Sequence, residues 1–282
     1  MSGRIICVGN GVLDQVYEVD ALPRAGVKTA ARAFRESGGG PAATAALAIA
    51  RLGGQAAWWG RVGDDTAGRY IRDELTRHGV DLSGVCTVPG ARTVRATVIV
   101  DSAGERSILV DRFGMPSDAA FLADHDLAGA AVLLADTRWP EGSAFALRRA
   151  AELGVLRVLD VDGGDPAILE ELVGLADHVV FSDEGLADFA GPGPAAERLS
   201  RAASCLGGIV AVPAFPVPVR DTTGCGDVFH GAYALGLAEG MPPLDAARFA
   251  AAAAALKAVN GRGWDGMPDR AAIEKIMMET QQ

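Results

Sequence analysis

The sequence is poor in aromatic residues and in cations, and its cysteines are scattered. Aromatic residues make up 6% of the 282 residues, and 36 Asp and Glu outnumber 26 Lys and Arg to give a net charge of −10. This acidic balance argues against nucleic acid or an anionic membrane as a partner, because both attract basic surfaces. Cys7, Cys86, Cys205 and Cys225 form no C-x-x-C pair, so neither a zinc site nor a disulfide framework is indicated.

Long apolar runs are missing as well. No run reaches membrane-spanning length, and a strand-like segment begins at Arg4 with no signal peptide before it. We therefore expect a protein of the reducing cytoplasm. A hydrophobic content of 49% over 282 residues is sufficient for one large α/β domain that spans residues 1–282 and carries a small appendage.

Strand-like and helix-like segments alternate along most of the chain. Strands are expected at Arg4–Val8, Ala56–Val62, Ala130–Asp136, Val155–Asp160, His178–Ser182 and Gly208–Val212. Helices are expected at Ala42–Leu52, Asp64–His78 with Asp64 as its cap, Cys225–Glu239 and Leu244–Val259. The alternation predicts a mostly parallel sheet with helices on both faces. Ligands should bind at the carboxyl ends of its strands, where we expect Asp14, Arg138, Asp160 and Asp162.

Four further strand-like runs fall outside this alternation, at about residues 12–36 and 92–112. Leu22-Pro23-Arg24-Ala25-Gly26 separates the first pair, and the hairpin turn Ser102-Ala103-Gly104 separates the second. These runs predict a small second sheet that forms a lid over the site. An extension of the main sheet at its edge is the alternative interpretation.

The stretch Asp221–Gly231 is the most informative about chemistry. Gly224 and Gly226 flank Cys225, Asp227 follows at once, and an apolar helical run begins there. Glycines before a helix let backbone amides converge on one point, and the helix N-terminus adds partial positive charge that favours a phosphate. A carboxylate beside such an anion site can deprotonate an alcohol, so the stretch predicts phosphoryl transfer. The alternative is a tight turn in which Asp227 only stabilises the helix dipole.

Two other glycine-rich stretches occur near the N-terminus. Gly38-Gly39-Gly40-Pro41 leads into a helix and permits close approach of a ligand to the backbone. Gly9-Asn10-Gly11 begins like a dinucleotide-binding fingerprint, but Asp14 stands where the third glycine belongs, which argues against a Rossmann cofactor site. Asp14 is a candidate to bind sugar hydroxyls, with a turn cap as the alternative.

These stretches resemble the motifs of the ribokinase-like (PfkB) carbohydrate kinases. Asp221–Phe229 is similar to D-T-T-G-A-G-D-x-F, with Cys225 in place of Ala, and the stretch from Gly39 is similar to G-G-x-x-x-N-x-A without its Asn. The resemblance implies a three-layer α/β/α fold with a mostly parallel central sheet, a small β-sheet lid and a homodimer formed through that lid. It also implies ATP and Mg²⁺ as cofactors, and leaves open a monovalent cation near Asp221 and Thr223.

The resemblance further implies a role for individual residues. The amides of Gly224, Cys225 and Gly226 would form the anion hole, and Asp227 would deprotonate the sugar hydroxyl. The sugar would be bound by Asp14, Gly39, Gly40 and Thr44, and the nucleotide by Thr223, Gly224, Gly226 and Asn260. The family's N-x-x-E motif, which organises magnesium through water, appears as Ser182-Asp183-Glu184-Gly185. Asp183 or Glu184 is therefore the candidate carboxylate, and helix capping is the alternative.

Segments along nearly the whole chain, including Gly60–Asp65 and Ala135–Trp139, are most similar to sulfofructose kinases. This implies phosphorylation of 6-deoxy-6-sulfofructose at O1, with Lys28 and Arg138 converging on the sulfonate through charge-assisted bonds. Val110 stands where these enzymes tend to place an Asn that helps to hold the sulfonate. A ribokinase- or fructokinase-type kinase for a neutral sugar therefore remains an alternative, whereas no aromatic-lined pocket indicates a nucleoside kinase.

Two further features leave alternatives open. The family has a strand and a hairpin before the D-T-T-G motif, but here Gly207–Val212 runs directly into the proline-rich stretch 213–218. A missing hairpin would remove one wall of the ATP site, and a catalytically inactive sugar-binding regulator is then the alternative function. Cys225 is either a reactive thiol, since a helix N-terminus lowers a thiol pKa, or a small residue in place of Ala.

Overall fold

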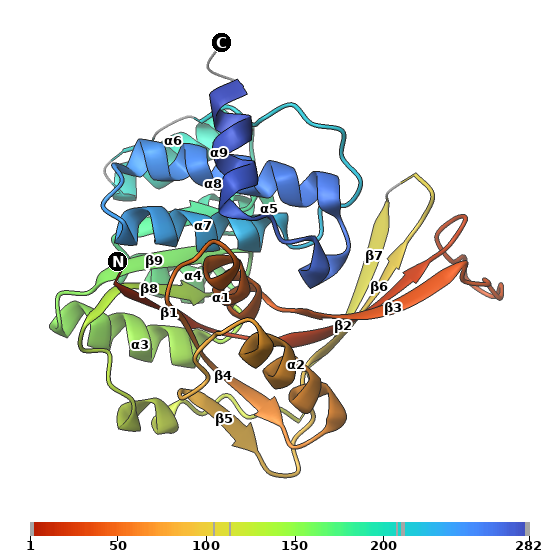
Figure 1. The fold of residues 1–282 in the computed structure, drawn as a ribbon, viewed down its shortest axis with the longest axis horizontal. Helices are drawn as coiled ribbons and strands as arrows, with labels where there is room; N and C mark the ends of the chain where they lie inside the picture. Colours follow the sequence, from red (N-terminus) through yellow and green to blue (C-terminus); the bar gives the residue numbers. More distant parts are fainter. Residues whose placement is uncertain (1–2, 104, 113, 207, 210–211, 280–282) are drawn as a thin grey trace.

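The computed structural model describes residues 3–279 except 104, 113, 207 and 210–211. Its centre is a six-stranded parallel sheet in the order β10-β9-β8-β1-β4-β5 (Figure 1). The strands are β1 (Arg4–Val8), β4 (Ala56–Gly63), β5 (Val85–Val88), β8 (Ala130–Asp136), β9 (Leu156–Val161) and β10 (His178–Phe181). The predicted parallel sheet is therefore present.

Helices cover both faces of this sheet. On one face lie α1 (Pro41–Arg51), α2 (Thr66–Arg77) and α7 (Cys225–Ala238), with α8 (Pro243–Asn260) packed on α7 and α9 (Arg270–Glu279) packed on α8. The other face carries α3 (Pro140–Glu152) and α4 (Pro166–Val173). The remaining helices are α5 (Asp183–Ala190), α6 (Ala195–Leu206), and the short 3₁₀ turns η1 (Ala120–Asp124) and η2 (Gly263–Gly266).

Strand β1 shows why the sequence forms this layered core. Ile5 and Cys7 pack into the core beneath α1 and α7, whereas Ile6 and Val8 pack into the core beneath α3. All four side chains are fully buried. A strand buried on both faces reads as a continuous apolar run, because successive side chains point to opposite sides of the sheet.

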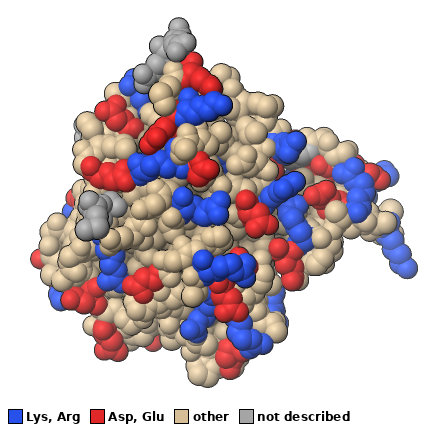
Figure 2. All heavy atoms as spheres, viewed as in Figure 1, with Lys and Arg blue, Asp and Glu red and all other residues tan. Residues whose placement is uncertain are grey.

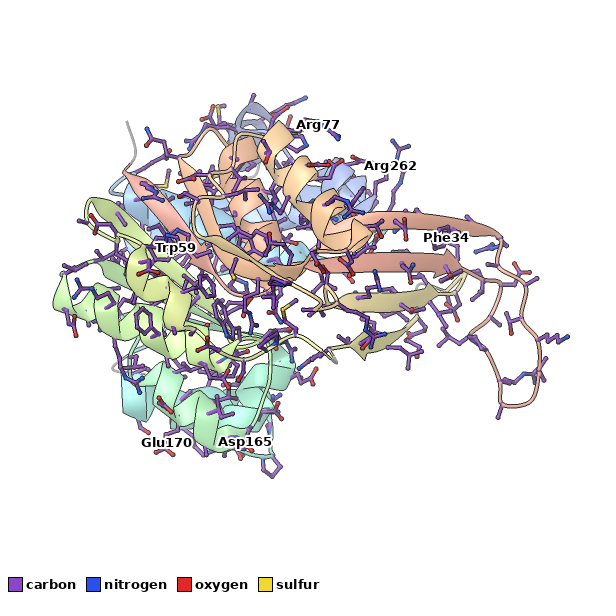
Figure 3. The ribbon with its side chains drawn as sticks, turned by 90° about the horizontal axis from the view of Figure 1, so that it is seen from below. Phe34, Trp59, Arg77, Asp165, Glu170 and Arg262 are labelled. Atoms are coloured by element: carbon purple, nitrogen blue, oxygen red, sulfur yellow. The ribbon has the colours of Figure 1, made fainter. Side chains whose placement is uncertain are left out.

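The lid is a separate four-stranded sheet in the order β3-β2-β6-β7. Its strands are β2 (Val12–Glu18), β3 (Ala33–Gly39), β6 (Arg95–Val100) and β7 (Arg106–Asp111). β2 pairs antiparallel with β3 and parallel with β6, and β7 pairs antiparallel with β6. The sheet projects from the main body, with Phe34 on its outer part (Figures 1 and 3).

Some sequence-based expectations about elements were wrong. Helix α2 is capped by Asp65 rather than Asp64, because the Asp65 carboxylate accepts a hydrogen bond from Gly68 N at 2.9 Å and also pairs with Arg95. The strand expected at 208–212 is not found: 208, 209 and 212 lie in no strand, and 210–211 lie outside the described residues. The prolines that follow lack the amide hydrogen that a ladder needs. β5, α9 and η2 were not predicted.

The surface agrees with the mixed composition of the sequence. Basic and acidic side chains are interspersed over the face in Figure 2, with no continuous basic field. Within the described ranges, no helix combines the length and the apolar character needed to cross a bilayer.

Asp136, at the carboxyl end of β8, connects three segments of the chain. Its Oδ2 accepts hydrogen bonds from the amides of Asn10 at 3.0 Å and Ala42 at 3.2 Å, and its Oδ1 accepts one from Arg138 N at 2.8 Å. The side chain is 1% exposed. Burial raises its pKa to about 6, while the bonds from these three amides oppose the shift. The end of β1, the start of α1 and the end of β8 are thus fixed to one carboxylate.

We predict that Asp136→Asn destabilises the fold by about 1–3 kcal/mol, because the amide NH₂ cannot accept and one buried backbone N–H loses its partner. Urea unfolding followed by circular dichroism measures this change. Asp126→Asn is the matched control, since exposed Asp126 also accepts from a backbone amide, Ala128 N at 2.8 Å. Equal stability of the two variants would contradict the assignment.

Candidate active site

The turn before α7 presents amides that are free to bind an anion. Gly224 adopts a left-handed conformation with φ 73°, and α7 begins at the next residue, Cys225. Cys225 N donates to Thr222 O at 3.2 Å, which closes the turn. Within the described chain, the amides of Gly224 and Gly226 have no hydrogen-bond acceptor. Two of the three predicted amides are therefore available at a helix N-terminus, where anions are favoured.

The glycine-rich stretches at residues 38–40 and 224–226 lie close together. This is required if both belong to one site. A Cβ added to Gly224 would lie 3.7 Å from Thr44 Cγ2 and 3.8 Å from Asp227 Oδ2. Thr44 belongs to the first turn of α1, directly after the glycine-rich bend 38–40. The Gly224–Asp227 turn and the start of α1 thus border one space.

Asp14 reaches the site from the lid rather than from the central sheet. The sequence-based expectation placed it at the end of β1, but the chain leaves the sheet at Gly9 (φ 151°) and Asp14 is the third residue of β2. The Asp14 carboxylate lies against Gly39, where an added Cβ would be 2.2 Å from Oδ2. Burial raises the pKa of Asp14 to about 7, although the charge of Arg35 opposes the shift.

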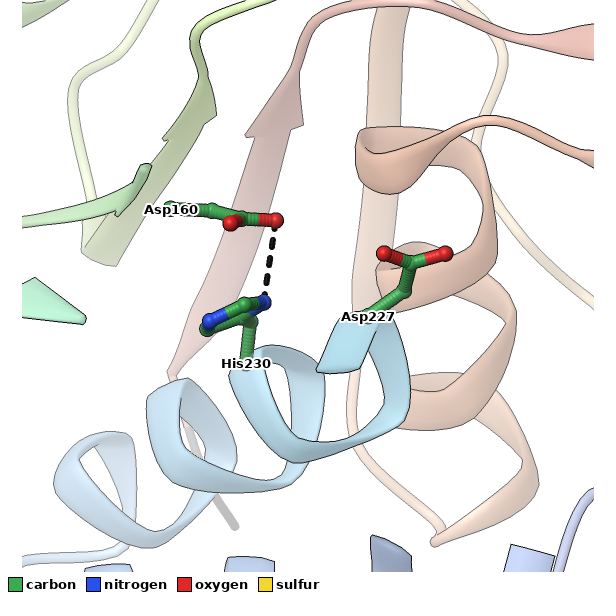
Figure 4. Close-up of side chains that lie close together, drawn as sticks. All are labelled: Asp160, Asp227 and His230. Carbon is green, nitrogen blue, oxygen red and sulfur yellow. Dashed lines mark ion pairs between the residues drawn. The ribbon is translucent and has the colours of Figure 1, made fainter. Parts of the chain in front are cut away.

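A second carboxylate and a histidine lie beside Asp227. Asp160, in β9, forms an ion pair with His230 through Oδ2 and Nδ1 at 2.9 Å, and both side chains are buried (Figure 4). Asp227 and His230 are three residues apart in α7, so they share one face of the helix. Sequence reasoning missed His230, although this spacing was a signal for it.

The charges around Asp227 control its protonation. Burial and the charges of Asp160, Asp162 and Asp14 raise the pKa of Asp227 to about 8, and the charge of His230 opposes them. Burial lowers the pKa of His230, but the pairing with Asp160 and the charges of Asp227 and Asp162 together raise it above its usual value. Asp14 and Asp227 therefore interact across the same space, although they come from the lid and from α7.

Two groups of side chains are candidates to bind a cation. Asp160, Asp227 and His230 offer ligand atoms within 4.8 Å of one another, but the first and last already form an ion pair. Of the predicted pair, Asp183 accepts from the buried Arg198 at 2.7 Å. Glu184 has no hydrogen-bond partner among the described residues and contributes to the raised pKa of Arg138.

The predicted cations of an anion pocket are not brought together. Arg138 donates to the carboxylate of Asp162 at 2.6 Å and to its carbonyl oxygen, so its charge is already paired. Lys28 is exposed in the segment between β2 and β3, and within the described chain it makes no contact with Arg138.

The loop after α8 packs onto the glycine-rich bend. Trp264 donates through Nε1 to Thr44 Oγ1 at 2.9 Å, and a Cβ added to Gly38 would lie 2.2 Å from its ring. Asn260 donates to Gly266 O at 3.1 Å within the loop. The predicted contacts of Thr44 with sugar and of Asn260 with nucleotide stay predictions, and both side chains have structural partners here.

The structure favours the interpretation of Cys225 as a small residue in place of Ala. Burial raises the pKa of its thiol to about 11, and nearby Asp221 and Asp227 raise it while Lys257 lowers it. The thiol is therefore protonated at neutral pH, and its Sγ lies 3.8 Å from Asp221 O.

The lid contacts the Asp221–Asp227 turn through two arginines. Arg35 of β3 pairs with Asp221 at 3.4 Å, and Arg106 of β7 donates to Thr222 Oγ1 at 3.1 Å. The lid is thus tied to the turn that carries the free amides and Asp227, which together suit an anion beside a base.

Comparisons of the sequence agree with this geometry. The model of the pfkB family carbohydrate kinases matches residues 2–206 and 200–264. The two matches overlap at residues 200–206, directly before the segment in which the described residues form no strand. A ribokinase of Arabidopsis thaliana is 29% identical over 97% of this chain and 80% of its own length. A fructokinase of Klebsiella pneumoniae is 30% identical over 86% of this chain and 87% of its own.

Solved structures confirm the predicted ribokinase-like fold. A putative ribokinase from Agrobacterium tumefaciens has a TM-score of 0.89 and 30% identity, with all of both chains covered. The Arabidopsis thaliana ribokinase complexed with ribose and ATP has a TM-score of 0.82 and 25% identity over 98% of this chain and 99% of its own. These findings do not point to the narrower resemblance to sulfofructose kinases. The chain belongs to the pfkB family of carbohydrate kinases, and the expectation of an ATP-dependent sugar kinase is confirmed.

Proposed function

We propose that the protein transfers the γ-phosphoryl group of ATP to a hydroxymethyl group of a neutral pentose or ketohexose, as a ribokinase- or fructokinase-type enzyme. The observation that carries this proposal is the position of Asp227, beside the two free amides of Gly224 and Gly226 and facing Asp14. The lid contacts the same turn through Arg35 and Arg106.

Each group has a chemical role in the proposed reaction. Asp14 accepts hydrogen bonds from sugar hydroxyls, and Asp227 accepts the proton of the attacking hydroxyl. The amides of Gly224 and Gly226 stabilise charge on the transferred phosphoryl group. The lid excludes water that would otherwise hydrolyse ATP.

Magnesium fits one carboxylate of this chain. Carboxylate oxygens and water are the ligands that Mg²⁺ prefers, and Glu184 has an oxygen acceptor free of protein partners whereas Asp183 is paired with Arg198. We propose that Glu184 holds the ion through water. When bound, Mg²⁺ neutralises charge on the nucleotide phosphates.

A neutral sugar is favoured over 6-deoxy-6-sulfofructose by the state of the two predicted cations. Arg138 is neutralised by Asp162, and Lys28 is exposed on the lid. A sulfonate would have to displace the Asp162 carboxylate to gain a bidentate arginine contact.

The sugar-binding regulator remains a second candidate because the described residues between α6 and α7 contain no strand. Such a protein would bind sugar without binding ATP. Calorimetry with each ligand separates it from the kinase.

An ADP-release assay over ribose, fructose, fructose 6-phosphate and sulfofructose tests the proposed function, and ribose or fructose should give the highest kcat/KM. Asp227→Asn should then lower kcat roughly 100- to 10,000-fold, because a general base contributes that much, and leave sugar binding largely intact. Turnover near that of the wild type would remove Asp227 from the mechanism. A clear preference for sulfofructose would overturn the neutral-sugar proposal.

The rate should depend on pH through Asp227. The base acts only when deprotonated and its pKa is raised to about 8, so kcat should rise with pH and level off above about 8. His230→Asn removes the positive charge that opposes the shift, so the rise of kcat should move to higher pH. Asp160→Asn removes a negative charge, so the rise should move to lower pH. Each shift should be roughly one to three pH units.

The matched control is Asp73→Asn on the exposed face of α2, which should leave the profile in place. Shifts in the same direction for His230→Asn and Asp160→Asn would exclude control of Asp227 by this ion pair. Profiles are measured at saturating sugar and ATP so that they report the bound enzyme.

We also propose that the lid forms the interface of a homodimer, as the resemblance to the family implied. On β7, an outer strand of the lid sheet, Ile108, Leu109 and Val110 are 49%, 65% and 44% exposed. Phe34 on β3 is 52% exposed. Consecutive exposed apolar side chains on an edge strand are typical of a surface that pairs with another chain. A second copy can supply the same strand in a symmetric contact.

Leu109→Glu should therefore shift the protein from dimer to monomer in light scattering coupled to size exclusion, because it places a charge in the apolar contact. Met278→Glu is the control, since Met278 is also 63% exposed but lies on α9. A wild-type monomer, or a Leu109→Glu dimer of unchanged affinity, would refute the lid interface.

A further inference from the structure

Lys257 is a buried cation directly beneath the turn that precedes α7. It lies in the last turn of α8, where the stretch Ala250–Val259 contains no other charged residue. The residue is 1% exposed. A lysine is seldom fully buried unless its charge is paired, so a specific role for the ammonium is indicated.

The contacts of the ammonium are two backbone carbonyl oxygens. Nζ donates to Thr223 O at 3.0 Å and to Gly261 O at 3.3 Å. Thr223 directly precedes Gly224, and Gly261 ends α8 with a positive φ of 61°. One ammonium therefore joins the anion-binding turn to the end of α8.

The charges around this contact are negative. Burial and the charge of Arg35 lower the pKa of Lys257, whereas the carboxylates of Asp221 and Asp227 favour its charged form. The Asp221 backbone amide also donates to Ala258 O at 3.2 Å. The position combines carbonyl oxygens, acidic neighbours and exclusion of water, which suits a monovalent cation.

We propose that the ammonium of Lys257 takes the place of a bound monovalent cation and fixes the anion-binding turn, so that turnover requires no K⁺. This inference rests on the proposed kinase function and deepens it. A free cation near Thr223, which the resemblance left open, would compete with a covalently attached positive charge for the same oxygen. Lys257 is thus a positioning residue that acts through the amides of Gly224 and Gly226.

The test measures ADP release in choline, Li⁺, K⁺ and NH₄⁺ chlorides at constant ionic strength. The wild type should have the same rate in all four salts. Lys257→Ala should lose about 100-fold in kcat in choline, since small misplacement of catalytic groups has effects of this size. K⁺ or NH₄⁺ should restore much of that rate by entering the vacated space, and Li⁺ and choline should not.

Lys257→Met separates charge from volume, because the methionine side chain fills the space without a charge. This variant should stay about 100-fold below the wild type in kcat in every salt. Lys275→Ala is the matched control, since the Lys275 side chain is 76% exposed on α9. Activation of the wild type by K⁺, or full activity of Lys257→Ala in choline, would overturn the inference. The wild-type measurement needs no variant to fold.

Thermal melting gives a readout independent of turnover. K⁺ and NH₄⁺ should raise the Tm of Lys257→Ala more than Li⁺ does, and should leave the wild type unchanged relative to choline. Absence of turnover with every sugar would remove the proposed function but not this cation-specific stabilisation. Equal melting shifts for both proteins would refute the cation replacement itself.

Discussion

The carboxylate of Asp136 is the contact on which the rest of the site depends. It lies at the end of β8, and it accepts from the amides of Asn10, Ala42 and Arg138, which belong to segments far apart in the sequence. These bonds replace water for groups that the sheet and α1 leave unpaired at their ends. The path out of β1 and the start of α1 are both set by this one side chain.

The site concentrates negative charge and contains few cations to balance it. Asp14, Asp160 and Asp162 all raise the pKa of Asp227, and His230 is the counter-ion beside them. Such an arrangement raises the pKa of the proposed base into the range where a proton can be accepted and released near neutral pH. A kinase gains from this, because the base must pick up the proton of the attacking alcohol.

Much of the fold followed from local patterns. The buried run of β1 and the glycines around residues 40 and 225 were readable because each element satisfies its own propensity. The position of Asp14 could not be predicted from the sequence, because the path of the chain out of the sheet depends on Gly9 and on the distant Asp136. The strand expected at 208–212 was wrong for residues 208, 209 and 212, since an apolar run also needs a neighbouring strand with which it can pair.

Only those parts of the candidate site that are local sequence motifs were predicted. The turn from Gly224 to Asp227 was readable as a local motif, and the fold places it against Thr44 of α1. His230 and Lys257 were missed, because their partners Asp160, Thr223 and Gly261 are supplied by the tertiary fold. The charge pairing of Arg138 with Asp162 likewise appears only once β8 and β9 lie side by side.

The position of Asp14 on β2 has a consequence for ligand affinity. A sugar held by Asp14 is held by the lid itself, so binding the sugar and docking the lid belong to a single equilibrium. The apparent dissociation constant then contains the fraction of molecules whose lid is already docked. Substitutions at Arg35 or Arg106, which tie the lid to the Asp221–Asp227 turn, would weaken sugar affinity without touching the sugar.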